Sequence, residues 1–172
     1  MFPVVMTEAL LIGGRSGVGK TSVAVELHEL LAAHSVRHAL VEGDTLDLAW
    51  PWPRDLAYQN LADVWRNFSA RGYSRLIYTN TNSVLDSEPL LAALGPRARA
   101  IGVLLTATDA TARSRLSRRE IGTALDAHLD RSARAANRLT AAPPWVTRVP
   151  TDDFTVPALA RDLATLTGWL PT

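Results

Sequence analysis

The stretch that decides the fold is 13–22, which reads Gly-Gly-Arg-Ser-Gly-Val-Gly-Lys-Thr-Ser. From Gly14 it fits G-x-x-x-x-G-K-[ST], the pattern of a glycine-rich loop (a P-loop) that cradles phosphate groups. An apolar run at 9–12 precedes the loop and a helix-forming run at 22–31 follows it, which is the strand–loop–helix setting that the motif requires. The alternative, an ordinary glycine-rich turn, ranks far below because the complete pattern rarely arises by chance.

Lys20 is the only lysine among the 18 Lys and Arg residues of the chain. Its compact ammonium group on a flexible stem can fold over the β- and γ-phosphates of a nucleotide. Backbone N–H groups of the loop and the positive end of the following helix also face those phosphates, and the Thr21 hydroxyl can ligate Mg²⁺. We therefore expect a nucleoside triphosphate to bind here. The residues expected to contact it are Gly14, Arg15, Ser16, Gly17, Val18, Gly19, Lys20, Thr21 and Ser22.

The composition is that of one folded domain, which we place at residues 1–172. Hydrophobic residues make up 47 % of the chain and charged residues 20 %, and the formal net charge of +1 gives no electrostatic reason to expect nucleic acid as a partner. The absence of cysteine excludes disulfides and thiolate chemistry. No basic leader and no apolar stretch near the ~18–20 residues that cross a bilayer is present, so we expect a cytoplasmic protein without a membrane partner. We expect a monomer or a homodimer.

Strand and helix signals alternate along the chain, which predicts an α/β fold with a parallel sheet and helices on both faces. We expect strands at about 8–13, 38–41, 75–79, 100–105 and 146–149. We expect helices at about 19–33, 54–71, 86–94, 109–139 and 156–166. The uninterrupted apolar run at 100–105 is expected to be the central strand, buried on both faces.

Polar residues follow three of these strands, at the edge of the sheet where ligands of open α/β sheets gather. Asp44 follows the second strand, Asn80 and Asn82 follow the third, and Thr106 follows the fourth. Asp44 would lie beside the P-loop, where a carboxylate can take a proton from an acceptor hydroxyl that attacks the γ-phosphate. Its alternative role is the N-cap of the short segment 45–50, and the two roles do not exclude each other.

The third strand lacks the aspartate that holds Mg²⁺ through water in many P-loop proteins. Its apolar residues run instead into Thr79 and Asn80. Mg²⁺ must then rely on Thr21, on nucleotide oxygens, on water and, through water, on Asp44. This departure weakens the interpretation as an ATP-driven motor or a GTPase, in which that acid is a standard part.

Arginines gather in the region expected to be helical at 109–139. Arg115, Arg118 and Arg119 precede Ile121-Gly122, a plausible break in the helix. Guanidinium groups on a mobile segment can neutralise the charge of a transferring phosphoryl group, and closure of the segment would exclude water. The alternative is a solvated helix face paired with nearby acids, which we expect for the arginines at 131 and 134.

Trp50 and Trp52, spaced by prolines, could form an aromatic wall for an acceptor molecule, and packing in a core or lid is the alternative. The four histidines show no metal-site spacing, so we expect structural or surface roles for them.

Taken together, these residues resemble the small P-loop kinases, and within them the chloramphenicol phosphotransferase-like and adenylylsulfate kinase-like groups. The resemblance rests on 13–22, on 42–46 with Trp50-Pro51, and on 113–122. It implies a P-loop NTPase fold of three α/β/α layers, with a five-stranded parallel sheet in the order 2-3-1-4-5 and a short Arg-rich lid at about 113–128. It also implies ATP and Mg²⁺ as co-substrates, Asp44 as the base, and a phosphate contact from Arg118 or Arg119. The loop after the last strand, with Thr151 and Asp152, would help to bind adenine.

We therefore expect an ATP-dependent phosphotransferase that moves the γ-phosphate to a hydroxyl of a small molecule, either antibiotic-like or a metabolite. Its expected catalytic groups are Lys20, Asp44, Arg118 and Arg119, with Arg115 assisting in nucleotide binding. One alternative is a nucleoside or nucleotide kinase, which differs only in its acceptor. Another is a regulatory or resistance protein that binds ATP without turning it over, which the acid-free third strand favours.

Overall fold

The computed structural model describes residues 6–53, 55–118 and 123–170. In this part of the chain five strands form one parallel sheet: β1 (Thr7–Gly13), β2 (Ala39–Glu42), β3 (Arg75–Thr79), β4 (Ala98–Thr106) and β5 (Thr147–Pro150). The order across the sheet is β2-β3-β1-β4-β5. The sheet predicted from the sequence is therefore confirmed in strand number, direction and order.

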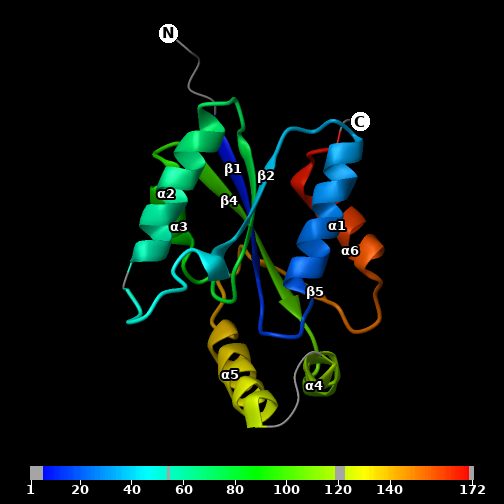
Figure 1. Ribbon diagram of the computed structural model, residues 1–172. Coiled ribbons are helices and arrows are strands. Elements are labelled where there is room, and N and C mark those ends of the chain that lie inside the picture. Colours follow the sequence, from blue (N-terminus) through cyan, green and yellow to red (C-terminus); the bar gives the residue numbers. More distant parts are fainter. Residues whose placement is uncertain (1–5, 54, 119–122, 171–172) are drawn as a thin grey trace.

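Helices cover both faces of this sheet, as Figure 1 shows. On one face lie α1 (Lys20–Ala33) and α6 (Val156–Thr167), and on the other lie α2 (Leu56–Ser69) and α3 (Ser87–Leu94). A short 3₁₀ turn, η1 (Gly43–Thr45), follows β2. Two further helices, α4 (Asp109–Ser117) and α5 (Thr123–Leu139), lie beyond the carboxyl ends of the strands. No helix in the described residues is both long and apolar enough to span a bilayer.

The central strand is β1, which explains why its apolar residues are continuous. Leu10 and Ile12 pack into the core against α1 and α6, while Ala9 and Leu11 pack into the core against α2 and α3. Side chains alternate across a strand, so a strand covered on both faces needs apolar residues at every position.

The expectation that 100–105 forms the central strand is wrong. β4 lies beside β1, and only Gly102–Leu105 are consecutively buried within it. The physical reason is the short neighbour on its other side, because β5 pairs only with Val103–Thr106. The first half of β4 therefore has a strand neighbour on one side only.

The region expected to be helical at 109–139 consists of two helices. Its two parts are α4 and α5, and the break proposed at Ile121-Gly122 lies outside the described residues. α4 begins with Thr108, whose hydroxyl accepts a hydrogen bond from the Thr111 backbone N–H at 3.2 Å. Such a cap satisfies one of the free N–H groups at a helix start, so the beginning of α4 is fixed locally.

Candidate functional site

The loop between β1 and α1 adopts a shape that depends on its glycines. Gly14, Gly17 and Gly19 have φ angles of +146°, +90° and +97°, a region that other residues rarely adopt. A Cβ on Gly14 would lie 2.7 Å from the Leu105 carbonyl oxygen, so the backbone there is packed too closely for a side chain. A Cβ on Gly19 would meet nothing within 4 Å, so this position borders open space.

A cavity of about 190 Å³ lies at the start of α1. It is lined by Ser16, Gly17, Gly19, Lys20, Thr21, Ser22, Asp44, Leu116 and His128. The Lys20 side chain folds back over the loop, where its Nζ donates hydrogen bonds to the carbonyl oxygens of Gly14 at 2.8 Å and Arg15 at 3.3 Å. Burial lowers the pKa of Lys20, and the negative charge of Asp44 opposes that shift. We call this space the phosphate cavity.

The Arg15 side chain, expected to contact the nucleotide, instead binds residues of α4 and α5. Its side chain is buried, with Nε donating to the Ser132 hydroxyl at 2.8 Å and Nη1 paired with Asp109. The Ser132 hydroxyl in turn donates to the Ser16 carbonyl oxygen at 2.9 Å. The Arg15 side chain therefore fastens α4 and α5 to the P-loop, and only its backbone is left to face a phosphate.

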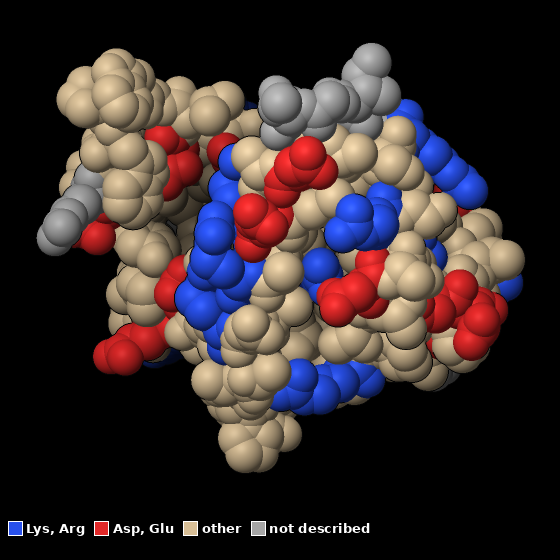
Figure 2. All heavy atoms as spheres, turned by 90° about the horizontal axis from the view of Figure 1, so that it is seen from below, with Lys and Arg blue, Asp and Glu red and all other residues tan. Residues whose placement is uncertain are grey.

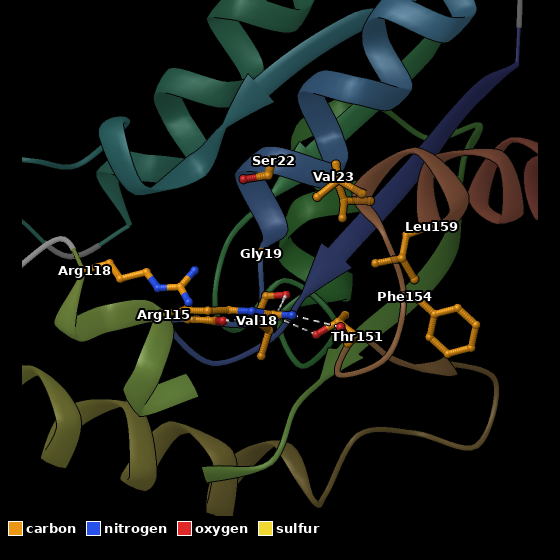
Figure 3. A pocket seen from close by; sticks show the side chains of 11 residues that line it. Val18, Gly19, Ser22, Val23, Arg115, Arg118, Thr151, Phe154 and Leu159 are labelled. Carbon is orange, nitrogen blue, oxygen red and sulfur yellow. Dashed lines mark hydrogen bonds between the residues drawn. The ribbon is translucent and has the colours of Figure 1, made fainter. Parts of the chain in front are cut away.

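A second cavity, of about 220 Å³, continues from the P-loop along the loop that follows β5 (Figure 3). It is lined by Gly17, Val18, Gly19, Ser22, Val23, Arg115, Arg118, Thr151, Phe154, Val156 and Leu159. In Figure 3 the Arg118 side chain lies at one end of this cavity and Phe154 lies at the other. Apolar side chains at one end and cations at the other match a nucleotide base and its phosphates.

Arg115 links the two walls of this second cavity. Its guanidinium group donates to the Val18 carbonyl oxygen at 3.2 Å, to the Thr151 hydroxyl at 2.9 Å and to the Thr151 carbonyl oxygen at 2.9 Å. Arg118 is exposed and lines the cavity, whereas Arg119 lies outside the described residues. The structure thus brings Arg115 and Arg118 to the P-loop.

Of the two residues of the loop after β5 that were expected to contact the nucleotide, only Thr151 lines the cavity. Thr151 is buried and lines the cavity, but the Asp152 carboxylate accepts hydrogen bonds from the Thr108 backbone N–H at 3.0 Å and hydroxyl at 2.9 Å. Hydrogen bonds from Thr111 and Thr108 lower the pKa of Asp152. Asp152 therefore holds the start of α4. The sequence interpretation missed Phe154 and Val156, whose only signal is their position just after that loop.

Asp44 lies beside the P-loop because of the strand order. β3 lies between β2 and β1, with Thr79 in register with Glu42 on one side and Ile12 on the other. η1 and the residue after β3 are therefore neighbours, and Asn80 Nδ2 donates to Asp44 Oδ1 at 2.6 Å. Burial raises the pKa of Asp44, and the positive charge of Lys20 opposes that shift. The alternative role of Asp44 as the N-cap of the segment 45–50 is wrong, because Asp44 lies within η1 and no helix follows at 46–50.

A third and larger cavity, of about 540 Å³, lies on the other side of Asp44. It is lined by Ser16, Asp44, Asp47, Trp52, Ala57, Tyr58, Tyr78, Asn80, Thr81, Asn82, Ser83, Asp86, Leu90, His128, Arg131, Ala135 and Arg138. Ser16, Asp44 and His128 line both this cavity and the phosphate cavity. We call the larger space the acceptor cavity. Asp44 thus stands at the boundary between the two.

The walls of the acceptor cavity are mainly polar. Trp52 lines it and donates from Nε1 to Asp47 Oδ2 at 3.0 Å, whereas Trp50 is 94 % exposed and does not line it. The expected aromatic wall is therefore reduced to Trp52. Arg131, expected on a solvated face with paired acids, also lines this cavity and forms no ion pair with another described residue.

The described residues contain no cluster of three or more His, Asp or Glu side chains suited to a metal ion. Thr21 is exposed in the phosphate cavity that Asp44 also lines. These two oxygen-bearing side chains are those that an Mg²⁺ ion could use, together with phosphate oxygens and water.

The parallel sheet and its P-loop define the fold of the small P-loop kinases. A gluconokinase from Sinorhizobium meliloti superposes with a TM-score of 0.64 at 16 % identity, covering 96 % of this chain and 95 % of its own. The tunicamycin resistance protein of Deinococcus radiodurans gives 0.64 at 18 %, covering 94 % and 96 %. APS kinase from Mycobacterium tuberculosis gives 0.58 at 18 %, covering 95 % and 99 %. Neither a family model nor a curated protein matches the chain. The resemblance predicted from the sequence is confirmed at the level of the fold.

Proposed function

We propose that this protein is an ATP-dependent kinase that transfers the γ-phosphate to a hydroxyl group of a small molecule, with Asp44 as the base. The observation that carries the proposal is the position of Asp44 between two cavities. One cavity is formed by the P-loop, and the other is large enough for a small polar molecule. A carboxylate at that boundary can reach the hydroxyl of a molecule in one cavity while facing the phosphate in the other.

The P-loop fits the phosphates of a nucleotide. The open space at the Gly19 Cβ position allows a phosphate to approach the backbone closely, and the loop N–H groups precede the positive end of α1. Lys20 already lies over the loop, and Arg115 and Arg118 border the adjoining cavity. Thr21 and, through water, Asp44 would hold Mg²⁺. ATP bound with Mg²⁺ supplies the phosphoryl group and the charge that makes it electrophilic.

Asp44 is tuned for proton transfer by its surroundings. Burial raises its pKa, which brings its proton affinity closer to that of a hydroxyl under attack. Asn80 holds the carboxylate through its Nδ2, and Lys20 keeps a positive charge nearby. Asp44 therefore accepts the acceptor proton at one carboxylate oxygen while the other stays hydrogen-bonded. The kinases that share the fold, the gluconokinase and the APS kinase among them, support phosphoryl transfer to a small molecule.

The test is an acceptor screen with ATP and Mg²⁺ that measures ADP release. The panel contains sugar acids, sugars, nucleosides and antibiotics, so that it also distinguishes a nucleoside kinase. Asp44→Asn should lower kcat about 100- to 10,000-fold, the range of a general base, with little change in ATP affinity. Asp63→Asn is the control, because Asp63 lies on the α2 surface with Arg66 as its partner. If no acceptor raises ADP release above background, kinase activity is refuted.

A second candidate function is ATP binding without turnover, and Asn80 favours it. This amide follows β3, where the Mg²⁺-holding aspartate of many P-loop enzymes stands. Tight ATP binding that Lys20→Ala removes, with no product from any acceptor, is the result expected of such a protein. The same screen therefore separates the two functions.

A further inference from the structure

We propose that the acceptor is a polyhydroxylated anion, whose carboxylate or phosphate group is bound by Arg131 and Arg138. The inference rests on the proposed function, in which the acceptor cavity holds the molecule to be phosphorylated. It goes further, because it selects one chemical class among alcohols, nucleosides and antibiotics. Four features of the cavity carry it: the arginines of α5, the acids across from them, the polar side chains among its other lining residues, and the order of the groups along α5.

One face of α5 presents cations to the acceptor cavity. The residues of this face are His128, Arg131, Ala135 and Arg138, with the spacing of three and four that puts side chains on the same side of a helix. Neither the Arg131 nor the Arg138 side chain has a hydrogen-bond or ion-pair partner among the residues that the structure describes. Two guanidinium groups in one cavity without a counterion are suited to a carboxylate or a phosphate, which they bind with paired N–H donors.

The opposite walls carry acids and amides. Asp44, Asp47 and Asp86 line the cavity from η1, from the loop after it and from the residue before α3. Figure 2 shows a band of basic side chains beside a hollow, with acidic side chains across from it. The two signs of charge are therefore held apart across the cavity, which suits a ligand with an anion at one end and hydroxyl groups at the other.

Two buried polar atoms in the same cavity have no partner. Asn82 Oδ1 and Ser83 Oγ make no hydrogen bond, and Ser83 is only 1 % exposed. A buried polar atom left unpaired costs about 1–3 kcal/mol, so such atoms normally have a partner. Burial also raises the pKa of Tyr78, which keeps its hydroxyl protonated and able to donate. The cavity is also lined by the polar side chains of Asn80, Thr81 and Asp86, which suit the hydroxyl groups of a polyol better than an apolar acceptor.

The order of the groups along α5 places the anion away from the reacting hydroxyl. His128 lines both cavities, so this part of α5 lies next to the phosphates. Arg131 is about one turn further along the helix, and Arg138 is about 15 Å from His128 at 1.5 Å per residue. A negative group bound there is kept apart from Asp44 and from the phosphates of ATP. Arg131 lies only about 4.5 Å from His128 along the helix axis, a span that an acceptor of several carbons covers.

The first experiment compares acid and neutral members of matched pairs. Gluconate with glucitol tests a carboxylate, and glucose 6-phosphate with glucose tests a phosphate, both with ATP and Mg²⁺. We expect kcat/KM to be roughly 10- to 100-fold higher for the acid member of at least one pair, the size of one or two charged hydrogen bonds. The double variant Arg131→Gln/Arg138→Gln should remove that preference through KM, with kcat within about threefold.

The control and a second measurement keep the outcome unambiguous. Arg134→Gln changes an exposed arginine of the same helix that does not line the cavity, and it should keep the preference. Calorimetry on protein saturated with ADP and Mg²⁺ measures the affinity for each pair without turnover. The proposal is supported if the acid member binds more tightly and only the double variant removes that preference. This holds even if no acceptor yields ADP, because the absence of ADP refutes only kinase activity. Equal binding of acid and neutral members, or binding of neither at millimolar concentration, overturns it.

Discussion

Asn80 stands where many P-loop proteins have an aspartate that holds Mg²⁺, and here it makes a hydrogen bond to Asp44 instead. Its Nδ2 donates to Asp44 Oδ1 at 2.6 Å, and its Oδ1 accepts from the Asn82 backbone N–H at 2.9 Å. The second bond fixes the orientation of the amide, so the donor faces Asp44 rather than solvent. An amide held in this way cannot ligate Mg²⁺ as a carboxylate does, but it orients the carboxylate of the proposed base. We regard Asn80 as a positioning residue.

Asn80→Ala tests that role. Loss of a hydrogen bond to a carboxylate destabilises its charged form, so the pKa of Asp44 should rise and the acid limb of the pH profile of kcat/KM should move to higher pH. We expect kcat to fall about 10-fold at neutral pH, the value of one charged hydrogen bond, with the KM for ATP unchanged. Asn67→Ala, on the exposed surface of α2, is the control. A lower kcat with an unmoved pH profile would show that Asn80 is merely structural.

The sequence predicts single residues well only where a local motif dictates them. Lys20 and Gly19 could be identified because their chemistry depends on neighbours within the same loop. The cavity-lining positions of Arg131, Ser83 and Phe154 could not, because they depend on which elements the fold brings together. Polarity alone does not show whether an arginine on a helix faces water or a cavity.

At the scale of elements, apolar periodicity and the Gly and Pro positions predicted most boundaries to within two residues. The error in the position of the central strand has a physical cause. The run at 100–105 indicated burial correctly in its second half, but burial does not reveal which strand is central.

The contact between α1 and the start of β2 includes a histidine pair. His38 Nδ1 lies 2.7 Å from the Val36 carbonyl oxygen, so this nitrogen carries the proton and donates. Nε2 of His38 is then the acceptor for His28 Nδ1, at 2.8 Å. Burial lowers the pKa of His38, opposed by its bond to Val36, and the charges of His28 and Arg75 lower it further. A neutral His38 therefore supports this contact.

The histidine pair predicts a pH-dependent stability. In the unfolded chain His38 takes up a proton near pH 6.5, whereas in the folded protein it does so only at lower pH. The unfolded state thus binds more protons than the folded state below pH 6.5. The neutral His38 therefore makes its whole contribution to the free energy of unfolding above that pH, and this contribution is lost as the pH drops below it. We expect a loss of about 1 kcal/mol, the size of the hydrogen bond that protonation breaks.

Urea unfolding at pH 7.5 and pH 5.5 measures this loss. The His38→Gln variant cannot take up the proton, so the change in unfolding free energy between these two pH values should shrink. His34→Gln is the matched control, since the His34 side chain is exposed and bonds only to the Leu30 carbonyl oxygen among the described residues. An equal pH dependence in wild type and His38→Gln would contradict the assignment.

At the scale of the whole molecule, the strand order assembles the site. β3 lies between β2 and β1, so the carboxyl ends of these three strands are neighbours. They bring Asp44, Asn80 and the P-loop to one edge of the sheet. α4 and α5 lie over that edge, where the Arg15 side chain fastens them to the P-loop. The single domain at 1–172 with a lid at 113–128 stays a prediction. The P-loop, near the start of the chain, contacts α4 and α5 from its second half. Nucleotide binding at the P-loop should therefore stabilise the whole folded protein.

This coupling predicts a thermal shift that separates nucleotide binding from catalysis. A non-hydrolysable ATP analogue with Mg²⁺ at 100 times its Kd adds about 2.7 kcal/mol to the free energy of unfolding, which for a domain of this size raises Tm by roughly 5–11 °C. Lys20→Ala should abolish most of the shift, because it removes the cation that lies over the loop. Asp44→Asn should keep the shift, since it removes a negative charge near the phosphates without changing the loop. Differential scanning calorimetry measures all three proteins. If Lys20→Ala shifts as far as wild type, the nucleotide binds elsewhere and the P-loop assignment fails. If Asp44→Asn loses the shift, Asp44 holds the nucleotide with its Mg²⁺, and the expectation that it leaves nucleotide affinity unchanged is overturned.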